Sequence, residues 1–379
     1  MTIYLIALFA ILLFGAAADH NISKRNKKRF IFIAFGILLF ISMLRHYTVG
    51  KDLEAHYYSS FLKVIDLPWN HLYTLGYENG YLTFYKILSL FTSDPQWMIA
   101  IHALFVIGVT GWFIYRNSED VVISTFMFIA TNTWFMYMTM LRQAMAVSLI
   151  LIALEIWKRK DWKIRRFVFY FLIVLIAVQF HSSAVAALFF PIFDFIPFKR
   201  KQILVSLTTM VISFVLYNQI YNAISVFSIG KRDYTDFYSR SESVINLTGL
   251  YFVFMYMGFF IIGVYCLVYH RKKPEPGEIT YESTSSKGFS DSFLLYMVFS
   301  LVVTRIMGLR INIVSRMSFY FIPFIFILIP RALNQFRLAK DKKLIKDTIY
   351  ILMMIAFIWL GFRNADFLYG TVPYKFFWE

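Results

Sequence analysis

Ionisable and aromatic side chains gather at five short stretches of an otherwise apolar chain, each at the end of an apolar run. In chain order the stretches are RHYTVGKD (45–52), GYENGY (76–81), LRQAMA (141–146), FHSSA (180–184) and RINIVSRMSFYF (310–321). Charged groups at the depth of a membrane are costly unless they face protein, water or a charged ligand. The five stretches therefore predict one site at a single membrane face.

The residue types in these stretches favour binding of phosphate and sugar. Arginine presents a planar fork of N–H donors that matches phosphate oxygens better than any other side chain. Tyrosines recur at 47, 57, 58, 77 and 81, and aromatic rings are surfaces on which sugar faces stack. Arg142 stands between two apolar runs with almost no loop, and Gln143 beside it adds further donors.

Each of these residues also has a purely structural interpretation. Arg45 and Arg316 end apolar runs and can extend to lipid headgroups, and a histidine such as His181 is commonly a satisfied structural residue. Asp52 follows Gly50 in a turn, while Glu78 at the start of a helix complements the helix dipole. The tyrosines fit an interfacial aromatic belt.

The composition places the chain in a membrane. Hydrophobic residues make up 59% of the sequence and aromatic residues 20%, and the mean hydropathy is +0.61. These values lie outside the range of soluble globular proteins. Cys266 is the single cysteine and lies inside an apolar run, which excludes an internal disulfide.

The apolar runs predict an all-α polytopic membrane protein with about twelve transmembrane helices in one bundle covering residues 1–379. The predicted spans are 2–18, 30–45, 97–115, 121–140, 143–157, 167–180, 183–197, 203–222, 249–269, 292–308, 316–330 and 347–363. Runs of this length cross about 30 Å of hydrocarbon. We interpret the first run as a retained span because no basic region precedes it.

Basic clusters set the orientation, since short cytoplasmic loops are enriched in lysine and arginine. The strongest clusters are 23–29, 158–166, 199–201, 270–273 and 331–346. All of them lie in the cytoplasm if both termini are outside and if the short run 77–91 does not cross. That run, with Glu78 and Lys86, is therefore predicted to be a re-entrant or interfacial helix. External loops are expected at about 46–96 and 223–248, and a mobile cytoplasmic loop at about 271–291.

This topology accounts for most of the net charge of +16, so we expect anionic membrane lipids as partners and no nucleic acid. The sequence has no glycine-rich phosphate loop, CxxC, HExxH or GxSxG. The acidic pair in DLE (52–54) arises often by chance. We predict neither a metal nor a cofactor.

The five stretches, in this order, resemble the EpsG family of bacterial exopolysaccharide and O-antigen polymerases, the Wzy-like proteins. Arg45, Gly50, Asp52 and Tyr57 begin the pattern, and it continues through Glu-x-Gly-Tyr, Leu-Arg-Gln, His-Ser-Ser-Ala and an Arg followed by Tyr-Phe. GYENGY has Asn79 where the family more usually shows the proline of a Glu-Pro-Gly turn. The resemblance covers most of the chain.

The resemblance implies a glycosyltransferase that joins undecaprenyl-diphosphate-linked repeat units at the outer face of the bacterial cytoplasmic membrane, with no cofactor and with a chain-length regulator and a flippase as possible partners. It further implies that Arg142 and Arg316 bind the substrate diphosphate, with Arg45 and Arg310 as the next candidates. The catalytic base is expected among Asp52, Glu78 and His181. Sugar binding is expected at Tyr57, Tyr81 and Tyr320.

Other functions stay open. An O-antigen ligase shares the chemistry and differs only in acceptor, and a polyprenyl-linked glycosyltransferase would use DLE as its acidic pair. A lipid-linked oligosaccharide flippase would place its cationic residues in a cavity open to both sides, whereas the predicted spans carry few charges below their outer third. A structural membrane scaffold would tolerate alanine at all five stretches.

Overall fold

The computed structural model describes residues 1–19, 24–219, 246–270, 288–336, 338–363 and 365–379. Helices dominate this part of the chain and no β-strand occurs in it; Arg45 and Phe376 form one isolated bridge. The predicted all-α class is therefore confirmed for the described ranges.

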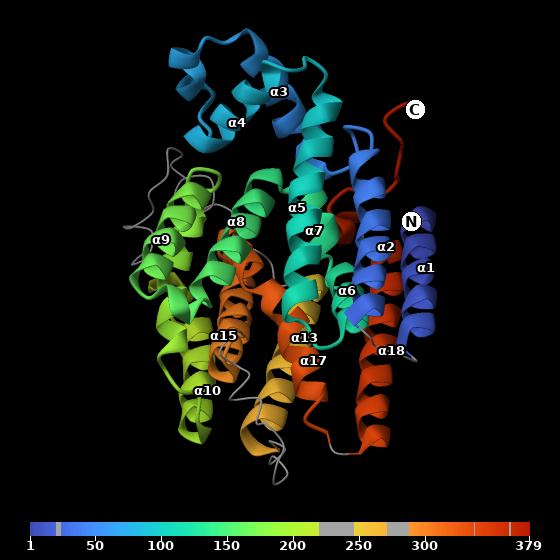
Figure 1. The fold of residues 1–379 in the computed structure, drawn as a ribbon, viewed down its shortest axis with the longest axis vertical. Helices are drawn as coiled ribbons and strands as arrows, with labels where there is room; N and C mark the ends of the chain where they lie inside the picture. Colours follow the sequence, from blue (N-terminus) through green and yellow to red (C-terminus); the bar gives the residue numbers. More distant parts are fainter. Residues whose placement is uncertain (20–23, 220–245, 271–287, 337, 364) are drawn as a thin grey trace. The chain divides into compact units, whose positions relative to one another are not determined.

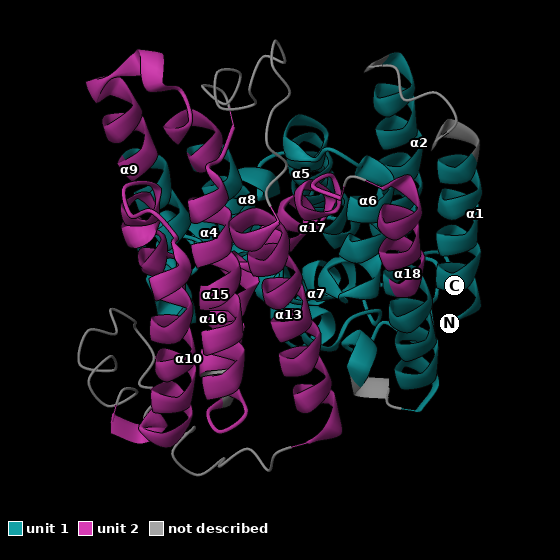
Figure 2. Ribbon diagram, turned by 90° about the horizontal axis from the view of Figure 1, so that it is seen from below, with its two compact units in different colours: residues 1–153, 172–181, 349–379 teal, residues 154–171, 182–348 magenta. Residues whose placement is uncertain are grey.

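Two compact units divide the chain (Figure 2). Unit 1 comprises Met1–Ala153, Leu172–His181 and Ile349–Glu379, and unit 2 comprises Leu154–Phe171 and Ser182–Thr348. That the two form one bundle in the membrane stays a prediction.

Unit 1 begins with a group of helices in which α2 packs along α5 and α1 packs against α2 and α6 (Figure 1). Its elements are α1 (Thr2–Asp19), α2 (Lys24–Met43), η1 (Leu53–Tyr58), α3 (Ser59–Asp66), η2 (Trp69–Leu75), α4 (Asn79–Ser89), α5 (Pro95–Asn117), α6 (Val121–Ala130), α7 (Thr133–Thr139) and η9 (Ala365–Leu368). Three helices continue from one unit into the other: α8 (Leu141–Trp157), α9 (Ile164–Val178) and α18 (Ala339–Arg363).

Unit 2 is organised around α15, which packs against α10, α13, α16, α17 and η4. Its elements are η3 (Lys160–Trp162), η4 (Ser182–Asp194), α10 (Arg200–Val215), α13 (Leu247–Val264), η5 (Tyr265–Tyr269), α15 (Asp291–Gly308), α16 (Asn312–Met317), η7 (Ser318–Tyr320), η8 (Ile322–Phe324) and α17 (Ile325–Leu333).

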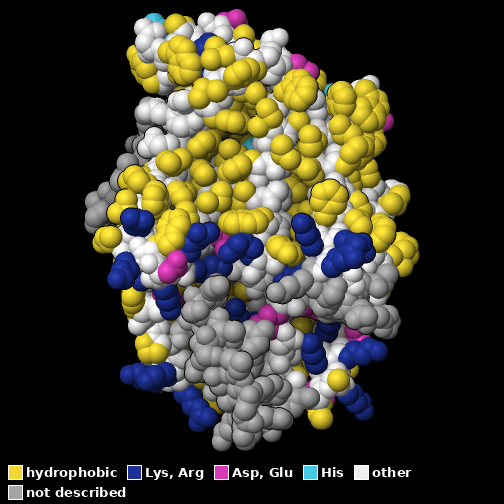
Figure 3. Space-filling model, viewed as in Figure 1, with side chains coloured by type: hydrophobic (Ala, Val, Ile, Leu, Met, Phe, Trp, Pro, Cys, Tyr) yellow, Lys and Arg dark blue, Asp and Glu magenta, His cyan; other side chains and the backbone are white. Residues whose placement is uncertain are grey.

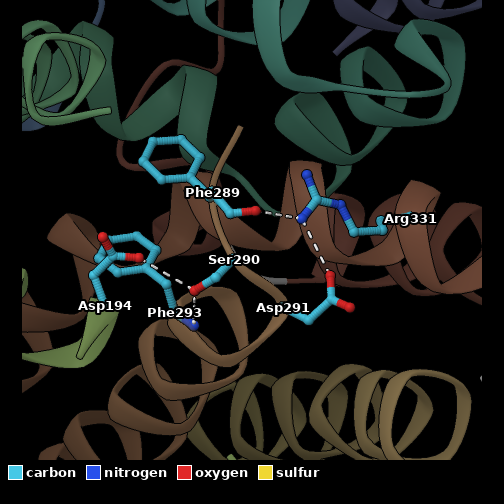
Figure 4. A network of polar contacts seen from close by, with 6 residues as sticks. All are labelled: Asp194, Phe289, Ser290, Asp291, Phe293 and Arg331. Atoms are coloured by element: carbon cyan, nitrogen blue, oxygen red, sulfur yellow. Dashed lines mark hydrogen bonds and ion pairs between the residues drawn. The ribbon is translucent and has the colours of Figure 1, made fainter. Parts of the chain in front are cut away.

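A polar network fixes the start of α15 (Figure 4). The Ser290 hydroxyl caps the helix by accepting from Phe293 N at 3.1 Å, and it donates to Asp194 at 3.3 Å. Arg331 of α17 donates to the Phe289 carbonyl and contacts Asp291 at 3.2 Å. The carboxylate in the first turn of α15 also complements the helix dipole, so this network has a clear structural role.

Large apolar side chains remain exposed on the helix surfaces. On α2 and α5 they include Phe32, Phe40 and Leu104, and Figure 3 shows hydrophobic side chains over much of the surface formed by these helices. Soluble monomers rarely expose apolar patches of such extent. This surface is what hydrocarbon chains of a bilayer would cover.

Four helices among the described residues are long and apolar enough to cross a membrane, and six spans result if two bent helix pairs count as one span each. The four are α5, α13 with η5, α15 and α18, and the bent pairs are Val121–Ala130 with Thr133–Thr139 and Val314–Tyr320 with Ile322–Leu333. The count of about twelve is not confirmed. Some predicted spans are short apolar helices, such as Thr2–Ala16 and Ser182–Asp194, and residues 220–222 of another lie outside the described ranges.

The predicted 77–91 segment contains helix α4, which has 11 residues. At a rise of 1.5 Å per residue it is about 16 Å long, which is too short to cross the hydrocarbon core. It packs on α3 and η2, so the first predicted external loop contains ordered helices. Most of the predicted loops 223–248 and 271–291 lies outside the described residues.

Membrane topology can be tested by single cysteines in a Cys266→Ser background. A reagent that does not cross membranes should label cysteines at positions 52 and 235 in intact cells, and should reach positions 162 and 280 only after permeabilisation, because the positive-inside rule predicts that the basic clusters lie in the cytoplasm. Labelling at position 162 in intact cells would contradict this orientation.

Candidate active site

The junction between α7 and α8 places Arg142 at a helix start inside unit 1. Helix α7 ends at Thr139 and α8 begins at Leu141, so a single residue, Met140, separates them. His102 of α5 donates from Nε2 to the Leu141 carbonyl at 2.8 Å; a carbonyl only accepts, so the proton is on Nε2. This buried histidine holds the backbone next to Arg142 and was not singled out from the sequence.

Arg142 forms an ion pair with Glu78, and two tyrosine rings face its guanidinium. Arg142 Nη1 donates to Glu78 Oε2, and the guanidinium carbon lies 4.7 Å from the ring centroid of Tyr77 and 5.7 Å from that of Tyr81. The Arg142 and Glu78 side chains are 15% and 20% exposed. Partial exposure leaves room for a ligand to reach the fork while the protein fixes its orientation.

The GYENGY stretch presents Glu78 to Arg142. Gly76 ends η2 in the left-handed region at φ 69°, and Glu78 occupies the N-cap position of α4 without capping the helix with its side chain. The carboxylate is engaged by the arginine instead. Glu78 thus has more than the helix-dipole role that its position alone indicates.

Gly80 brings the end of α9 against α4. The Tyr81 amide donates to the Gln179 carbonyl at 3.1 Å, and a Cβ at position 80 would lie 2.6 Å from Gln179 Cβ and 2.9 Å from Gln179 O. The rings of Phe84 and Phe180 lie 6.3 Å apart beside this contact. The second, third and fourth sequence stretches, the last as far as His181, therefore meet in unit 1.

Substitution Gly80→Ala should destabilise this contact, because no methyl group fits there without moving backbone. We expect a loss of about 1–3 kcal/mol, typical of overpacking, and a lower thermal unfolding midpoint of the purified protein in detergent. Gly108→Ala in α5 is the matched control, since its Cβ would meet nothing within 4 Å. Equal midpoints for both variants would contradict the close packing.

Four tyrosines next to Arg142 form what we call the tyrosine cluster: Tyr57, Tyr77, Tyr81 and Tyr85. Two of them, Tyr77 and Tyr81, face the guanidinium of Arg142. Ring centroids lie 5.9 Å apart for Tyr57 and Tyr81, 5.7 Å for Tyr77 and Tyr81, and 4.3 Å for Tyr81 and Tyr85. All four are buried. Burial raises the pKa of Tyr81 and of Tyr85 well above the usual value, so both phenols stay protonated at neutral pH.

The predicted sugar-binding tyrosines Tyr57, Tyr81 and Tyr320 are all buried and pack against protein, so sugar stacking on them stays a prediction. Tyr47 and Tyr58 are half-buried. Their rings stack with centroids 4.4 Å apart, and they are more exposed than the three predicted tyrosines.

Asp52 occupies the N-cap position of η1, next in the chain to a residue that packs with the tyrosine cluster. It is half-buried and its carboxylate caps no helix amide, and the next residue, Leu53, belongs to the buried cluster that contains Tyr57, Tyr81 and Leu141. Gly50 adopts φ 119°, where a Cβ would lie 3.1 Å from the Met138 carbonyl. The glycine is therefore required by the path of the loop.

Residues 367–379, the C-terminal strap, hold the loop that carries Asp52. Gly50 N donates to the Gly370 carbonyl at 3.0 Å and Lys51 N to the Tyr369 carbonyl at 2.9 Å. Further along, His46 N donates to the Lys375 carbonyl at 2.9 Å. The strap pairs with a segment more than 300 positions earlier, which no local sequence pattern indicates.

Arg45 is fully buried under this loop. Its guanidinium donates to the carbonyl of Ser42 and, at 3.1 Å, to that of Met138. Bonds to backbone carbonyls of two helices make Arg45 a structural residue in this arrangement, and we leave it out of the diphosphate site proposed below. Its predicted role in diphosphate binding is untested.

The remaining predicted residues lie in unit 2. Arg310 is exposed, with the rings of Phe214 and Tyr217 both 5.6 Å from its guanidinium carbon, and Arg316 is half-buried in α16. The Tyr320 hydroxyl and the Ser183 hydroxyl are 2.9 Å apart. Ser183 of the fourth stretch therefore contacts the fifth stretch within unit 2.

No group of three His, Cys, Asp or Glu side chains within the described ranges could hold a metal ion together.

The sequence model of the EpsG family matches residues 28–376. The chain belongs to the EpsG family. No curated protein and no solved structure matches the chain. Membership in the EpsG family makes it an exopolysaccharide-related membrane protein, and the match includes all five polar stretches.

One further arginine of this EpsG-family chain was not singled out from the sequence. Arg305 lies in the last turn of α15, five residues before the stretch that begins at Arg310. Its position inside an apolar run with a single charge was the signal that could have identified it.

Proposed function

We propose that this chain is a polysaccharide polymerase that joins undecaprenyl-diphosphate-linked oligosaccharide repeat units at the outer face of the bacterial cytoplasmic membrane. Membership in the EpsG family supports a role in polysaccharide synthesis. The observation that carries the proposal is the partly exposed Arg142 fork, held by Glu78 and flanked by Tyr77 and Tyr81.

The proposed reaction is a glycosyl transfer. A hydroxyl oxygen of the acceptor repeat unit attacks the anomeric carbon of the donor glycan, and the bond from that carbon to the lipid diphosphate oxygen breaks. A carboxylate takes the hydroxyl proton, and undecaprenyl diphosphate leaves with the bonding electron pair. The donor is already activated, so the step needs neither nucleotide nor redox partner.

Arg142 would stabilise the diphosphate as negative charge develops on it. Preorganised donors aimed at a developing anion commonly contribute the largest single part of catalysis. The tyrosine cluster and the ion pair with Glu78 restrict the rotamers of the arginine, so little side-chain entropy remains to be lost when the diphosphate binds.

Of the three predicted bases, Asp52 is the one we favour. Glu78 is engaged by Arg142, which suits a positioning role. Asp52 is half-buried and its carboxylate does not cap η1, so it can accept a proton from a hydroxyl within hydrogen-bond reach.

The function is tested by the glycan ladder of a strain that lacks the gene, complemented with the wild-type gene or with an empty vector. A polymerase predicts that the deletion leaves single capped repeat units and that the wild-type gene restores the ladder. Loss of all surface glycan with lipid-linked repeats retained inside would indicate a flippase. Full-length polymer that stays lipid-linked would indicate a ligase, and an unchanged ladder would contradict all three.

A further inference from the structure

Helix α15 carries a cationic side chain inside a segment that is long and apolar enough to cross a membrane. The helix covers Asp291–Gly308, and Arg305 lies in its last turn. A charged side chain within an apolar span is costly unless an anion, water or polar protein group compensates it. Arg305 therefore requires a partner.

Aromatic rings surround the guanidinium of Arg305. Its central carbon lies 5.1 Å from the ring centroid of Phe252, 5.2 Å from that of Phe319 and 5.6 Å from that of Tyr256. Phe252 and Tyr256 come from α13 and Phe319 from η7, and all three are buried. Ring faces attract a cation, but they carry no full negative charge.

The guanidinium of Arg305 lacks the carboxylate partner that Arg142 and Arg331 have within the described ranges. Its Nε is buried and has no hydrogen-bond partner within the described part of the chain. By contrast, Arg142 pairs with Glu78 and Arg331 with Asp291. No carboxylate of the described ranges forms an ion pair with Arg305, whose side chain is only half-buried.

We propose that Arg305 binds the phosphate group of a lipid in unit 2. The planar fork matches the geometry of phosphate oxygens, and a half-buried side chain is accessible to such a ligand. Because the helix is a candidate membrane span and Arg305 lies in its last turn, the phosphate of a lipid is the anion that fits this position.

Two lipids offer this chemistry: a polyprenyl diphosphate, as in the proposed substrate, and an ordinary anionic phospholipid. The inference does not depend on the polymerase function, since a bound phospholipid would satisfy Arg305 equally well. The experiment must therefore distinguish the two lipids.

Native mass spectrometry of the full chain in detergent provides the test. The probes are undecaprenyl diphosphate, phosphatidylglycerol, undecaprenol as the chain without phosphate, and inorganic pyrophosphate as the anion without a chain. The variants are Arg305→Gln, which removes the charge, and Arg305→Lys, which keeps the charge and loses the fork. Arg363→Gln is the matched control, an exposed arginine 5.2 Å from the ring of Trp359.

We expect Arg305→Gln to weaken binding of a phosphate-bearing lipid by at least about tenfold, Arg305→Lys to weaken it less, and Arg363→Gln to leave it unchanged. An effect on undecaprenyl diphosphate alone would identify a substrate site, and an equal effect on phosphatidylglycerol a general phospholipid site. Wild-type lipid binding in both Arg305 variants would overturn the proposal, as would an equal loss for undecaprenol or binding of pyrophosphate alone. Because Arg305→Lys retains the charge, it remains informative if Arg305→Gln does not fold.

Discussion

Replacement of Arg142 by alanine is expected to abolish chain extension while the protein still inserts in the membrane. The variant removes the donors that would stabilise the departing diphosphate, and loss of one such donor group commonly costs about a hundred- to a thousandfold in rate. It also leaves Glu78 without its partner. The measurement is the glycan ladder of the complemented deletion strain, with the amount of protein in the membrane determined by immunoblot.

Three further variants test whether the loss of chain extension comes from the proposed diphosphate site at Arg142. Arg142→Lys keeps the charge without the planar fork and should fall between wild type and alanine. Glu78→Gln should be milder than Arg142→Ala if Glu78 only orients the arginine. Arg159→Ala removes an exposed arginine that faces a ring in the same way, 4.7 Å from Trp162, and should leave the ladder intact. A wild-type ladder from Arg142→Ala would remove this residue from the proposed mechanism.

The substitution Asp52→Asn is expected to reduce polymer formation by about a hundred- to ten-thousandfold, the range typical of a lost general base. The amide has nearly the same shape as the carboxylate, so the loop under the C-terminal strap should keep its structure. The rate of chain extension, measured with membranes of cells that express the variant, gives the size of the effect.

Asp66→Asn is the matched control for this substitution. Asp66 ends α3 in the same predicted external segment and is exposed, so its amide should support normal extension. Binding of the lipid-linked substrate by Asp52→Asn should stay close to that of wild type, because a base acts on the acceptor proton and not on the diphosphate. Reduced binding with an unchanged extension rate would show that Asp52 is not the base.

The sequence predicted the helical class and singled out Glu78 and Arg142, which the structure brings together in unit 1. The spacing in GYENGY and LRQAMA marked Glu78 and Arg142 as unusual, because charged groups between apolar runs are costly wherever they lack a partner. That the two residues pair was not predictable, since they lie 64 positions apart and the pairing depends on how α4 packs. The predicted base His181 lies two residues after Gln179, whose carbonyl accepts a hydrogen bond from the Tyr81 amide of α4.

Arg45 is a residue whose role the sequence alone does not determine. An arginine at the end of an apolar run extends to a headgroup, binds a ligand or satisfies buried carbonyls, and the local pattern is the same in each case. The structure places its guanidinium on carbonyls of Ser42 and Met138. These contacts depend on tertiary packing, which has no local signature in the sequence.

A count of apolar runs could not predict the number of membrane spans either. The run 121–140 is interrupted at Asn132, which adopts φ 63° and whose amide donates to the Phe367 carbonyl at 2.7 Å, so two short helices meet at 54°. Residues such as Asn tolerate the left-handed region, yet a hydropathy window does not register the break.

The most direct test of the central claim is polymerisation by the purified full chain in lipid vesicles supplied only with a synthetic undecaprenyl-diphosphate-linked repeat unit. We predict a ladder of glycan lengths, one undecaprenyl diphosphate released for each new bond, and no ladder from Arg142→Ala. Release of undecaprenyl diphosphate without bond formation, or an intact repeat unit after incubation with correctly folded protein, would contradict the assignment as a polymerase.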